Sequence, residues 1–206
     1  MPTLRTAILV SGGGRTMQNL VQLSRAGSLP IDVPLVIGSK VGLGGLDRAL
    51  KLDVPRVEAV ERKEFPSVAA FSERVFGLCD EAGVELIVLA GWLCLLELPE
   101  KYVNRMLNIH PALLPAFGGQ GMYGHHVHAA VIGHGCKVSG CTVHFCDNTY
   151  DTGPIIAQRV CPVLDDDTPD ALAARVFEQE MIAYPEAIRL YAEGRLKIEG
   201  RRVRVV

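Results

Sequence analysis

Two polar side chains, Asn108 and His110, stand two residues apart where a short apolar run stops at Pro111. The run predicts a strand, and alternate residues of a strand project from one face, so the amide and the imidazole should lie side by side. Such a pair can bind the oxyanion of a tetrahedral intermediate, and a carboxylate such as Asp151 can hold the imidazole charged and oriented. We therefore expect Asp151 to raise the pKa of His110 above that of a free imidazole. The chemistry indicated is acyl transfer, and the alternative is three unrelated turn residues.

A glycine-rich turn follows the first apolar run of the chain. Backbone N–H groups freed by glycine, together with the positive end of the helix expected next, favour an anion. The segment therefore predicts a phosphate site formed by Gly12, Gly13, Gly14, Arg15 and Thr16. It has no P-loop lysine, and Met17 interrupts the Gly-x-Gly-x-x-Gly spacing, so binding of a dinucleotide is disfavoured. A tight turn without a ligand is the alternative.

The N-terminal part alternates apolar runs with stretches of helical period. Strands are expected over 5–10, 33–37, 56–57 and 85–90, and helices over 17–24, 46–52 and 68–82. The run Leu86–Leu89 is continuous, as in strands covered on both faces. This alternation predicts an α/β fold with a mainly parallel, Rossmann-like sheet and helices on both faces. Ligands should meet beyond the carboxyl ends of the strands, where Gly13 and His110 are expected.

The C-terminal part predicts more strands, a short helix and a terminal hairpin. The expected strands cover 106–109, 139–145 and 155–163, the helix 127–132 and the hairpin 196–206. The segment from Gly118 to Gly124 is too rich in glycine for regular structure and predicts a mobile loop. A long helix should begin at Thr168-Pro169, a capping residue followed by a proline at the first helical position, and Pro185 should restart it.

The composition is typical of a globular chain, with 49% apolar residues, 21% charged residues and a net charge of −2. At 206 residues we expect one domain over 1–206. The charge predicts no nucleic-acid partner. No apolar window is long enough to cross a membrane, and the first residues do not resemble a signal peptide, so we expect a cytoplasmic enzyme.

No metal site is expected from the cysteines or histidines. None of the six cysteines lies in a Cys-x-x-Cys pair, so free thiols are favoured over disulfide bridges. Cys136, Cys141 and Cys146 alternate faces if they lie on a strand, which disfavours zinc. Three histidines lie close together in the sequence: His125, His126 and His128. No thiol or carboxylate lies at a familiar ligand spacing from them, so we interpret this segment as a polar loop leading into a helix.

Two further polar residues stand in apolar surroundings. Glu180 shares a helical face with Tyr184 and Ile188, where a carboxylate needs a partner. It either pairs with a basic residue such as Arg175 or reaches a hydroxyl or amine of a substrate, and both interpretations stay open. His144 lies in an expected strand and is interpreted as a histidine with satisfied hydrogen bonds that supports the site, not as a catalyst.

Several motifs occur in a characteristic order: Ser11–Gly14, Leu89–Trp92, Asn108–Pro111 with Leu113–Pro115, Val143–Phe145, Asp151–Pro154, and Gln179-Glu180 ahead of Tyr184-Pro185. On these motifs the chain resembles, over nearly its full length, the phosphoribosylglycinamide formyltransferases, a folate-dependent family with the formyltransferase fold. The resemblance implies transfer of a formyl group from 10-formyltetrahydrofolate to the amine of glycinamide ribonucleotide, in de novo purine (IMP) biosynthesis. It implies small-molecule partners alone, without a metal, and a monomer or homodimer.

The same resemblance implies roles for particular residues. Asn108, His110 and Asp151 would be the catalytic trio, the glycine turn would bind the phosphate of the nucleotide, and Glu180 would help to bind that nucleotide. A folate pocket would be lined by Leu93, Cys94, Leu95, Leu96 and Tyr150. The nucleotide-binding half would cover about 1–100, and the catalytic and folate half about 101–206.

Two positions depart from the family pattern. Arg15-Thr16 replaces the usual Ser-Asn, which leaves the acceptor amine open, and Cys94 replaces an arginine that many relatives carry beside the pterin. The alternatives are a formyltetrahydrofolate hydrolase, a formyltransferase acting on another amine, and a noncatalytic nucleotide-binding protein. The hydrolase normally has an extra N-terminal domain and a second histidine where this chain has Pro111. A formyltransferase for methionyl transfer RNA would need a basic C-terminal domain, for which we expect no room.

Overall fold

The computed structural model describes residues 3–206 and divides into two compact units, one ending at Leu107 and the other beginning at Asn108. In the first unit the strands pair in the order β3-β2-β1-β4, and each of these pairs is parallel. The strands are β1 (Leu4–Val10), β2 (Ile31–Gly38), β3 (Arg56–Ala59) and β4 (Leu86–Leu89). Residues 7–10, 35–37 and 86–88 are completely buried, which explains their continuous apolar runs.

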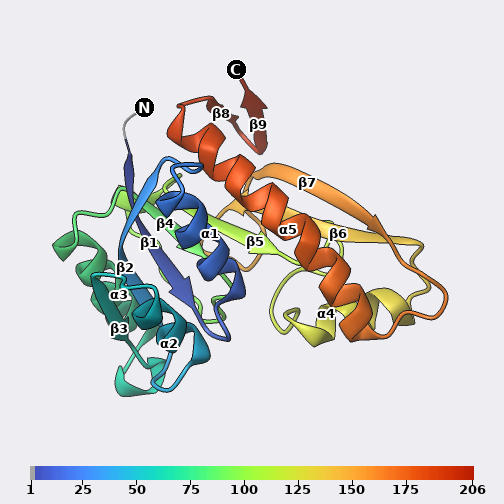
Figure 1. Ribbon diagram of the computed structural model, residues 1–206, viewed down its shortest axis with the longest axis horizontal. Helices are drawn as coiled ribbons and strands as arrows, with labels where there is room; N and C mark the ends of the chain where they lie inside the picture. The colour runs from blue at the N-terminus through green and yellow to red at the C-terminus, as the bar shows by residue number, and fades with distance from the viewer. Residues whose placement is uncertain (1–2) are drawn as a thin grey trace. The chain divides into compact units, whose positions relative to one another are not determined.

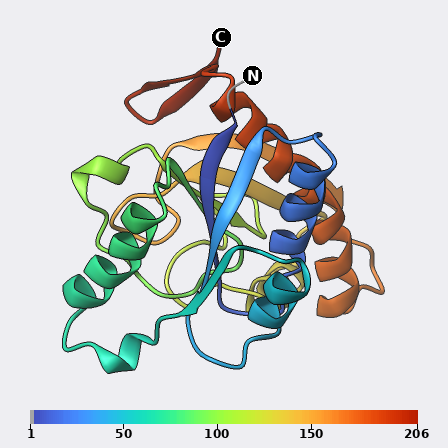
Figure 2. The ribbon, with the colours of Figure 1, turned by 60° about the vertical axis from the view of Figure 1, so that its left-hand side comes forward.

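The helices of the first unit cover both faces of these strands, as expected. They are α1 (Arg15–Arg25), α2 (Gly44–Lys51) and α3 (Val68–Glu81), with short 3-10 turns η1 (Arg62–Glu64) and η2 (Glu100–Tyr102). Figure 2 shows α3 on one side of β1 and β2, and α1 and α2 on the other. Helix α1 buries Met17, Leu20 and Val21 on one stripe, and the Ser67 hydroxyl caps α3 by accepting from the Ala70 N–H at 3.1 Å.

The second unit combines a mixed sheet with two helices. Strand β5 (Met106–His110) crosses the division, and its end lies beside β6 (Val138–Phe145), which pairs antiparallel with β7 (Ile155–Pro162). The expected hairpin follows as β8 (Leu196–Glu199) and β9 (Arg202–Val205). Helix α4 covers His125–Gly133, and the long helix α5 (Pro169–Ala192) packs along β6 and β7 (Figure 1).

The α/β fold with a mainly parallel sheet is confirmed, and the observed elements begin and end within a few residues of the expected positions. The Thr168 hydroxyl accepts from the Ala171 N–H at 3.2 Å, which confirms the expected cap of α5.

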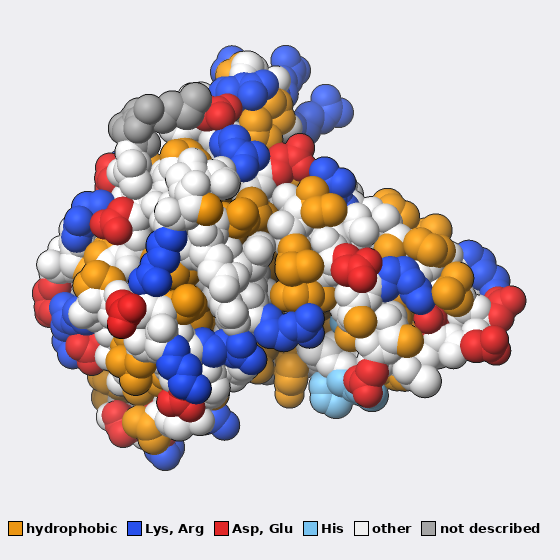
Figure 3. Space-filling model, viewed as in Figure 1, with side chains coloured by type: hydrophobic (Ala, Val, Ile, Leu, Met, Phe, Trp, Pro, Cys, Tyr) orange, Lys and Arg blue, Asp and Glu red, His pale blue; other side chains and the backbone are white. Residues whose placement is uncertain are grey.

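The outer face of α5 keeps exposed apolar side chains, with Met181 39% and Ile182 48% exposed, and Figure 3 shows hydrophobic side chains over this helix. That residues 1–206 fold as a single domain stays a prediction. Within residues 3–206, none of the helices is long and apolar enough to span a membrane.

The interruption expected at Pro185 is wrong, because α5 is one helix with Pro185 buried inside it. A proline in a helix interior loses a hydrogen bond to the carbonyl four residues earlier, which costs roughly 3 kcal/mol. Here the residues around it, Ala183, Tyr184 and Ile188, are completely buried. Packing of this face therefore outweighs the local preference to break the helix.

Candidate active site

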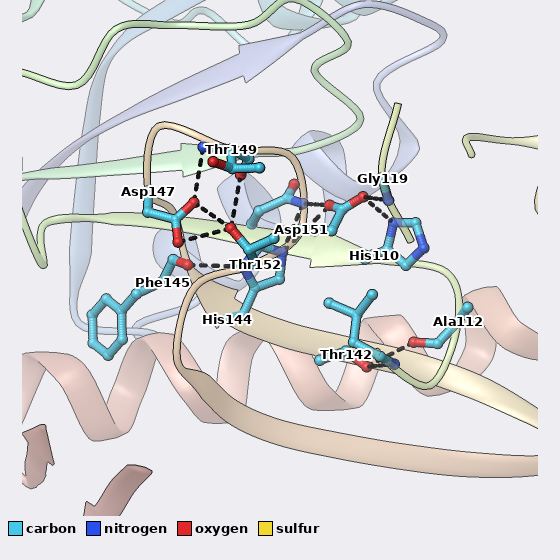
Figure 4. Close-up of polar contacts among 12 residues, drawn as sticks. His110, Ala112, Gly119, Thr142, His144, Phe145, Asp147, Thr149, Asp151 and Thr152 are labelled. Carbon is cyan, nitrogen blue, oxygen red and sulfur yellow. Dashed lines mark hydrogen bonds and ion pairs between the residues drawn. The ribbon is translucent and has the colours of Figure 1, made fainter. Parts of the chain in front are cut away.

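The polar cluster of the second unit gathers side chains from two strands and one loop. Asn108 and His110 lie on β5, His144 lies near the end of β6, and Asp151 lies in the loop that joins β6 to β7. The structure brings all four into contact, although Asp151 follows His110 only after a helix and a strand (Figure 4). The cluster lies almost entirely out of solvent, with the His110 side chain 4% and the Asp151 side chain 10% exposed.

Asp151 is the centre of this cluster. Its Oδ2 lies 3.4 Å from His110 Nδ1 and accepts from the Gly119 N–H at 2.9 Å, while its Oδ1 accepts from Asn108 Nδ2 at 3.3 Å. Burial by itself raises the pKa of this carboxyl, but the interaction with His144, the charge of His110 and the Gly119 N–H outweigh it. The pKa of Asp151 is consequently below its ordinary value, and Asp151 is ionised at neutral pH.

His110 has an acceptor on each side of its ring. Nε2 lies 2.8 Å from the carbonyl of Phe117, and Nδ1 faces Asp151. Only the protonated imidazole can donate to both acceptors at once. Burial nevertheless lowers the pKa of His110, against the opposing effects of Asp151 and the Phe117 carbonyl. The expectation of a pKa above that of a free imidazole is therefore wrong: Asp151 acts with the expected sign, but desolvation is larger.

His144 orients Asn108. Its Nδ1 lies 2.8 Å from the carbonyl of Phe145 and donates to it, while Nε2 lies 3.1 Å from Asn108 Nδ2 and 3.6 Å from Asp151 Oδ1. In the neutral ring, Nε2 accepts from the Asn108 amide. The two hydrogens of the Asn108 amide are therefore directed to His144 and Asp151. This geometry is that of a buried histidine with satisfied hydrogen bonds, which places the ring in support of the amide.

Two other residues singled out by the sequence belong to this unit. Tyr150 is half-buried and immediately precedes Asp151. Glu180 is half-buried on α5. Burial, together with the charge of Glu180, raises the pKa of the Cys141 thiol to about 12. Arg175 forms its ion pair with Asp167 at 2.6 Å. The role of Glu180 toward a nucleotide stays a prediction.

In the first unit, the glycine turn connects the carboxyl end of β1 to α1. Gly14 has a left-handed backbone, φ 74°, that favours glycine, and a Cβ on it would lie 2.7 Å from the Cα of Gly45. A Cβ on Gly12 or Gly13 would meet no atom within 4 Å, so these residues face open space. The first turn of α1 has no acidic side chain and no side-chain cap, and its N–H groups suit an anion. Arg15 and Thr16 are the first two residues of the helix.

The segment expected to line the folate pocket follows β4 at the same edge of the first unit. The Leu93 N–H donates to Ser11 Oγ at 3.0 Å, which ties this segment to the start of the glycine turn. Leu93 is 43% exposed, whereas Leu96 is only 4% exposed. Cys94 and Leu95 are half-buried, and burial raises the pKa of the Cys94 thiol. The exposed Leu93 beside the buried Leu96 forms an apolar surface that suits a ring system.

Four residues that contact the cluster or its loop were not predicted as site residues from the sequence: Phe117, Gly119, Asp147 and Thr152. Phe117 and Gly119 act through backbone groups, which no residue type reveals. Asp147 and Thr152 are small polar residues of a turn, which is a detectable signal because the aspartate side chain favours hydrogen bonds to backbone N–H groups two residues further on.

All six cysteines are free thiols. Within residues 3–206, no group of three histidine, cysteine or acidic side chains is arranged to hold a metal ion.

We predict that two buried imidazoles make the free energy of unfolding depend on pH. Burial lowers the pKa of both His110 and His128 from 6.5, so the unfolded chain binds more protons just below that pH. The contribution of the two neutral imidazoles to the free energy of unfolding is fully present above pH 6.5. It is lost as the pH falls below 6.5, by up to about 1.4 kcal/mol per pH unit for each group.

Chemical denaturation at pH 7.5, 6.5 and 5.5 measures this slope. His128→Gln should reduce the slope below pH 6.5, and His126→Gln, at an exposed histidine of the same helix, is the matched control. Equal slopes in both variants would contradict the assignment.

Comparisons with known proteins found a matching family and similar chains. The formyl transferase family matches residues 4–188. The phosphoribosylglycinamide formyltransferases of the chloroplasts of Arabidopsis thaliana and Vigna unguiculata are 39% and 41% identical to this chain, over 94% and 93% of its length. The chain spans 67% and 62% of the length of these two plant proteins.

A solved structure is similar throughout. Glycinamide ribonucleotide transformylase 1 from Symbiobacterium toebii superposes with a TM-score of 0.93 and 41% sequence identity. The match covers 99% of this chain and 94% of that one.

Proposed function

Because this chain belongs to the formyl transferase family, we propose that it transfers a formyl group from 10-formyltetrahydrofolate to the amine of glycinamide ribonucleotide in de novo purine (IMP) biosynthesis. The observation that carries the proposal is the buried contact of Asp151 with both Asn108 and His110. Binding a nucleotide does not require an amide and an imidazole held against one ionised carboxylate, whereas stabilising an oxyanion does require donors of this kind.

The reaction needs a place for negative charge. The amine nitrogen attacks the formyl carbon, a C–N bond forms, and an electron pair moves onto the formyl oxygen. The intermediate then expels N10 of the folate, and the proton lost by the amine ends on N10. Asn108 and His110 would donate N–H groups to this oxygen, His110 by turning its Nε2–H from the Phe117 carbonyl to the oxygen, so their stabilisation would act mainly in the transition state.

The geometry indicates how the Asn108 donor becomes available. The formyl oxygen would replace Asp151 as acceptor of the longer bond from Asn108, 3.3 Å, while the bond to His144 keeps the amide oriented. Asp151 stabilises the imidazolium form of His110, which burial disfavours in the free protein. As the oxyanion develops, its charge adds to that of Asp151 and favours the protonated ring.

The remaining site residues divide between the two ligands. We assign the phosphate of the nucleotide to the turn formed by Gly12, Gly13, Gly14, Arg15 and Thr16, supported by the lack of a side-chain cap on α1 and by the open space at Gly12 and Gly13. Glu180 would bind another polar group of the nucleotide. The folate would lie against Leu93, Cys94, Leu95, Leu96 and Tyr150, supported by the exposure of Leu93. The protein would act in the cytoplasm as a monomer or homodimer, without a metal, a membrane or a nucleic acid.

One assay tests this function. We expect loss of 10-formyltetrahydrofolate and formation of tetrahydrofolate only when glycinamide ribonucleotide is present, with an unchanged rate after treatment with a metal chelator. Mass spectrometry should show one formyl group on the nucleotide. Consumption of the donor without a nucleotide would instead establish hydrolysis, and transfer to a different amine would establish another acceptor.

A further inference from the structure

The loop between β6 and β7 is closed tightly at its base. The Phe145 N–H donates to the Pro154 carbonyl at 2.9 Å. Gly153 is packed so closely on this base that a Cβ would lie 1.7 Å from the Phe145 carbonyl oxygen. Residues 147–152 therefore project as a short loop from a rigid base, and Asp151 is the residue of this loop that reaches the cluster.

Asp147 and Thr152 join the two sides of this loop. The Thr152 hydroxyl lies 2.7 Å from Asp147 Oδ1 and 2.9 Å from Oδ2, and it donates its one hydrogen to this carboxylate. Asp147 Oδ1 also accepts from the Thr149 N–H at 2.9 Å, which fixes the turn between them (Figure 4). One carboxylate thus holds both ends of the segment that contains Asp151.

Asp151 needs such support because of its backbone. Its φ of 57° is in the left-handed region, which is uncommon for residues with a side chain, although aspartate adopts it more often than most. Thr152 follows it directly, and the Thr152 carbonyl is also bound, accepting from Arg201 Nη2 at 2.8 Å. With the residue after Asp151 anchored at both its hydroxyl and its carbonyl, this uncommon conformation is held and the carboxylate stays directed at His110.

We propose that Asp147 and Thr152 are positioning residues, whose hydrogen bond holds the Asp151 carboxylate against His110 and Asn108. The pair, which we call the loop clamp, does not itself touch the reacting atoms. Its importance for turnover rests on the proposed formyl transfer, but its effect on the geometry of Asp151 does not. Removing the Thr152 hydroxyl should let Asp151 relax away from His110 while leaving the open glycine turn unaltered.

Kinetics of Thr152→Val and Asp147→Ala test the loop clamp. We expect each variant to lower kcat by roughly 10-fold, with both KM values changed by less than about 3-fold, because the loss is in the transition state. Thr152→Ser keeps the hydroxyl and should restore kcat to near the wild-type value. Asp165→Ala removes a carboxylate that is 90% exposed in the same unit and is the matched control for Asp147→Ala.

A second readout does not need turnover. The pKa of His110, followed by NMR of the ¹⁵N-labelled imidazole, should fall further in Thr152→Val and return in Thr152→Ser, since Asp151 is the charge that raises it. Wild-type kcat and an unchanged His110 titration in Thr152→Val, or failure of serine to restore either quantity, would overturn the proposal. Absence of transfer to glycinamide ribonucleotide by the wild-type protein would refute the proposed function alone, because the titration still reports on the loop clamp.

Circular dichroism identifies a variant that has lost its native structure. Asp147→Asn then provides the decisive comparison, because its amide oxygen can still accept from Thr149 and Thr152. We expect it to retain the His110 titration. A shift in Asp147→Asn as large as that in Asp147→Ala would show that the hydrogen bonds of residue 147 do not position Asp151.

Discussion

Replacing Asp151 with asparagine is expected to lower kcat by about 10²-fold or more, with binding of both substrates changed far less. The amide can still accept from the Gly119 N–H, so the loop should keep its place, but the charge that opposes the desolvation of His110 is lost. The pKa of His110 should therefore fall further, and less imidazolium is available when the oxyanion forms. Steady-state kinetics with both substrates varied measures the effect, and Asp165→Asn, at an exposed position, is the control.

The trio should also behave as one unit. His110→Ala and Asn108→Ala should each reduce kcat, and combining either with Asp151→Asn should cost much less than the product of the single losses. Residues that act on the same charge are not additive, because the first substitution already removes what the second would weaken. Multiplicative losses, or an Asp151→Asn enzyme within about threefold of wild type, would show that the trio is not a catalytic unit.

Replacing Gly13 with leucine is expected to raise the KM for the nucleotide by about 10²-fold while leaving the KM for the folate nearly unchanged. A Cβ at Gly13 meets no protein atom within 4 Å, so a larger side chain there would occupy the place of the phosphate instead of distorting the turn. The measurement is initial rates with each substrate varied in turn. Thr16→Ala is the milder change and tests whether a hydroxyl contributes to the phosphate site.

Gly77→Leu is the matched control for this substitution. Gly77 belongs to α3 of the same unit, and a Cβ on it also meets nothing within 4 Å. It should leave both KM values unchanged. An equal loss of folate affinity in Gly13→Leu would indicate that the turn is structural and binds no phosphate.

Local interactions explain why much of the fold could be predicted. The run Leu86–Leu89 is buried on both faces, and the cap at Thr168 depends on residues three positions apart, so neighbouring positions contain the information needed. Pro185 is an exception to these local preferences. Its local preference is to break a helix, but burial of the residues around it by distant strands overrides that preference.

The candidate site also has features that follow from residue types and features that depend on folding. The residue types and their spacing identify which chemical groups are present: an amide and an imidazole on alternate positions of β5, a carboxylate far along the chain, and a glycine turn before α1. Folding brings Asp151 into contact with His110, adds backbone groups of Phe117 and Gly119 to the cluster, and closes the loop through Asp147 and Thr152, and none of these contacts can be read from residue types. The direction of the His110 pKa depends on that structure as well. A neighbouring charge can be proposed from residue types, but the larger effect is desolvation, which exists only once the surrounding chain has excluded water from the ring.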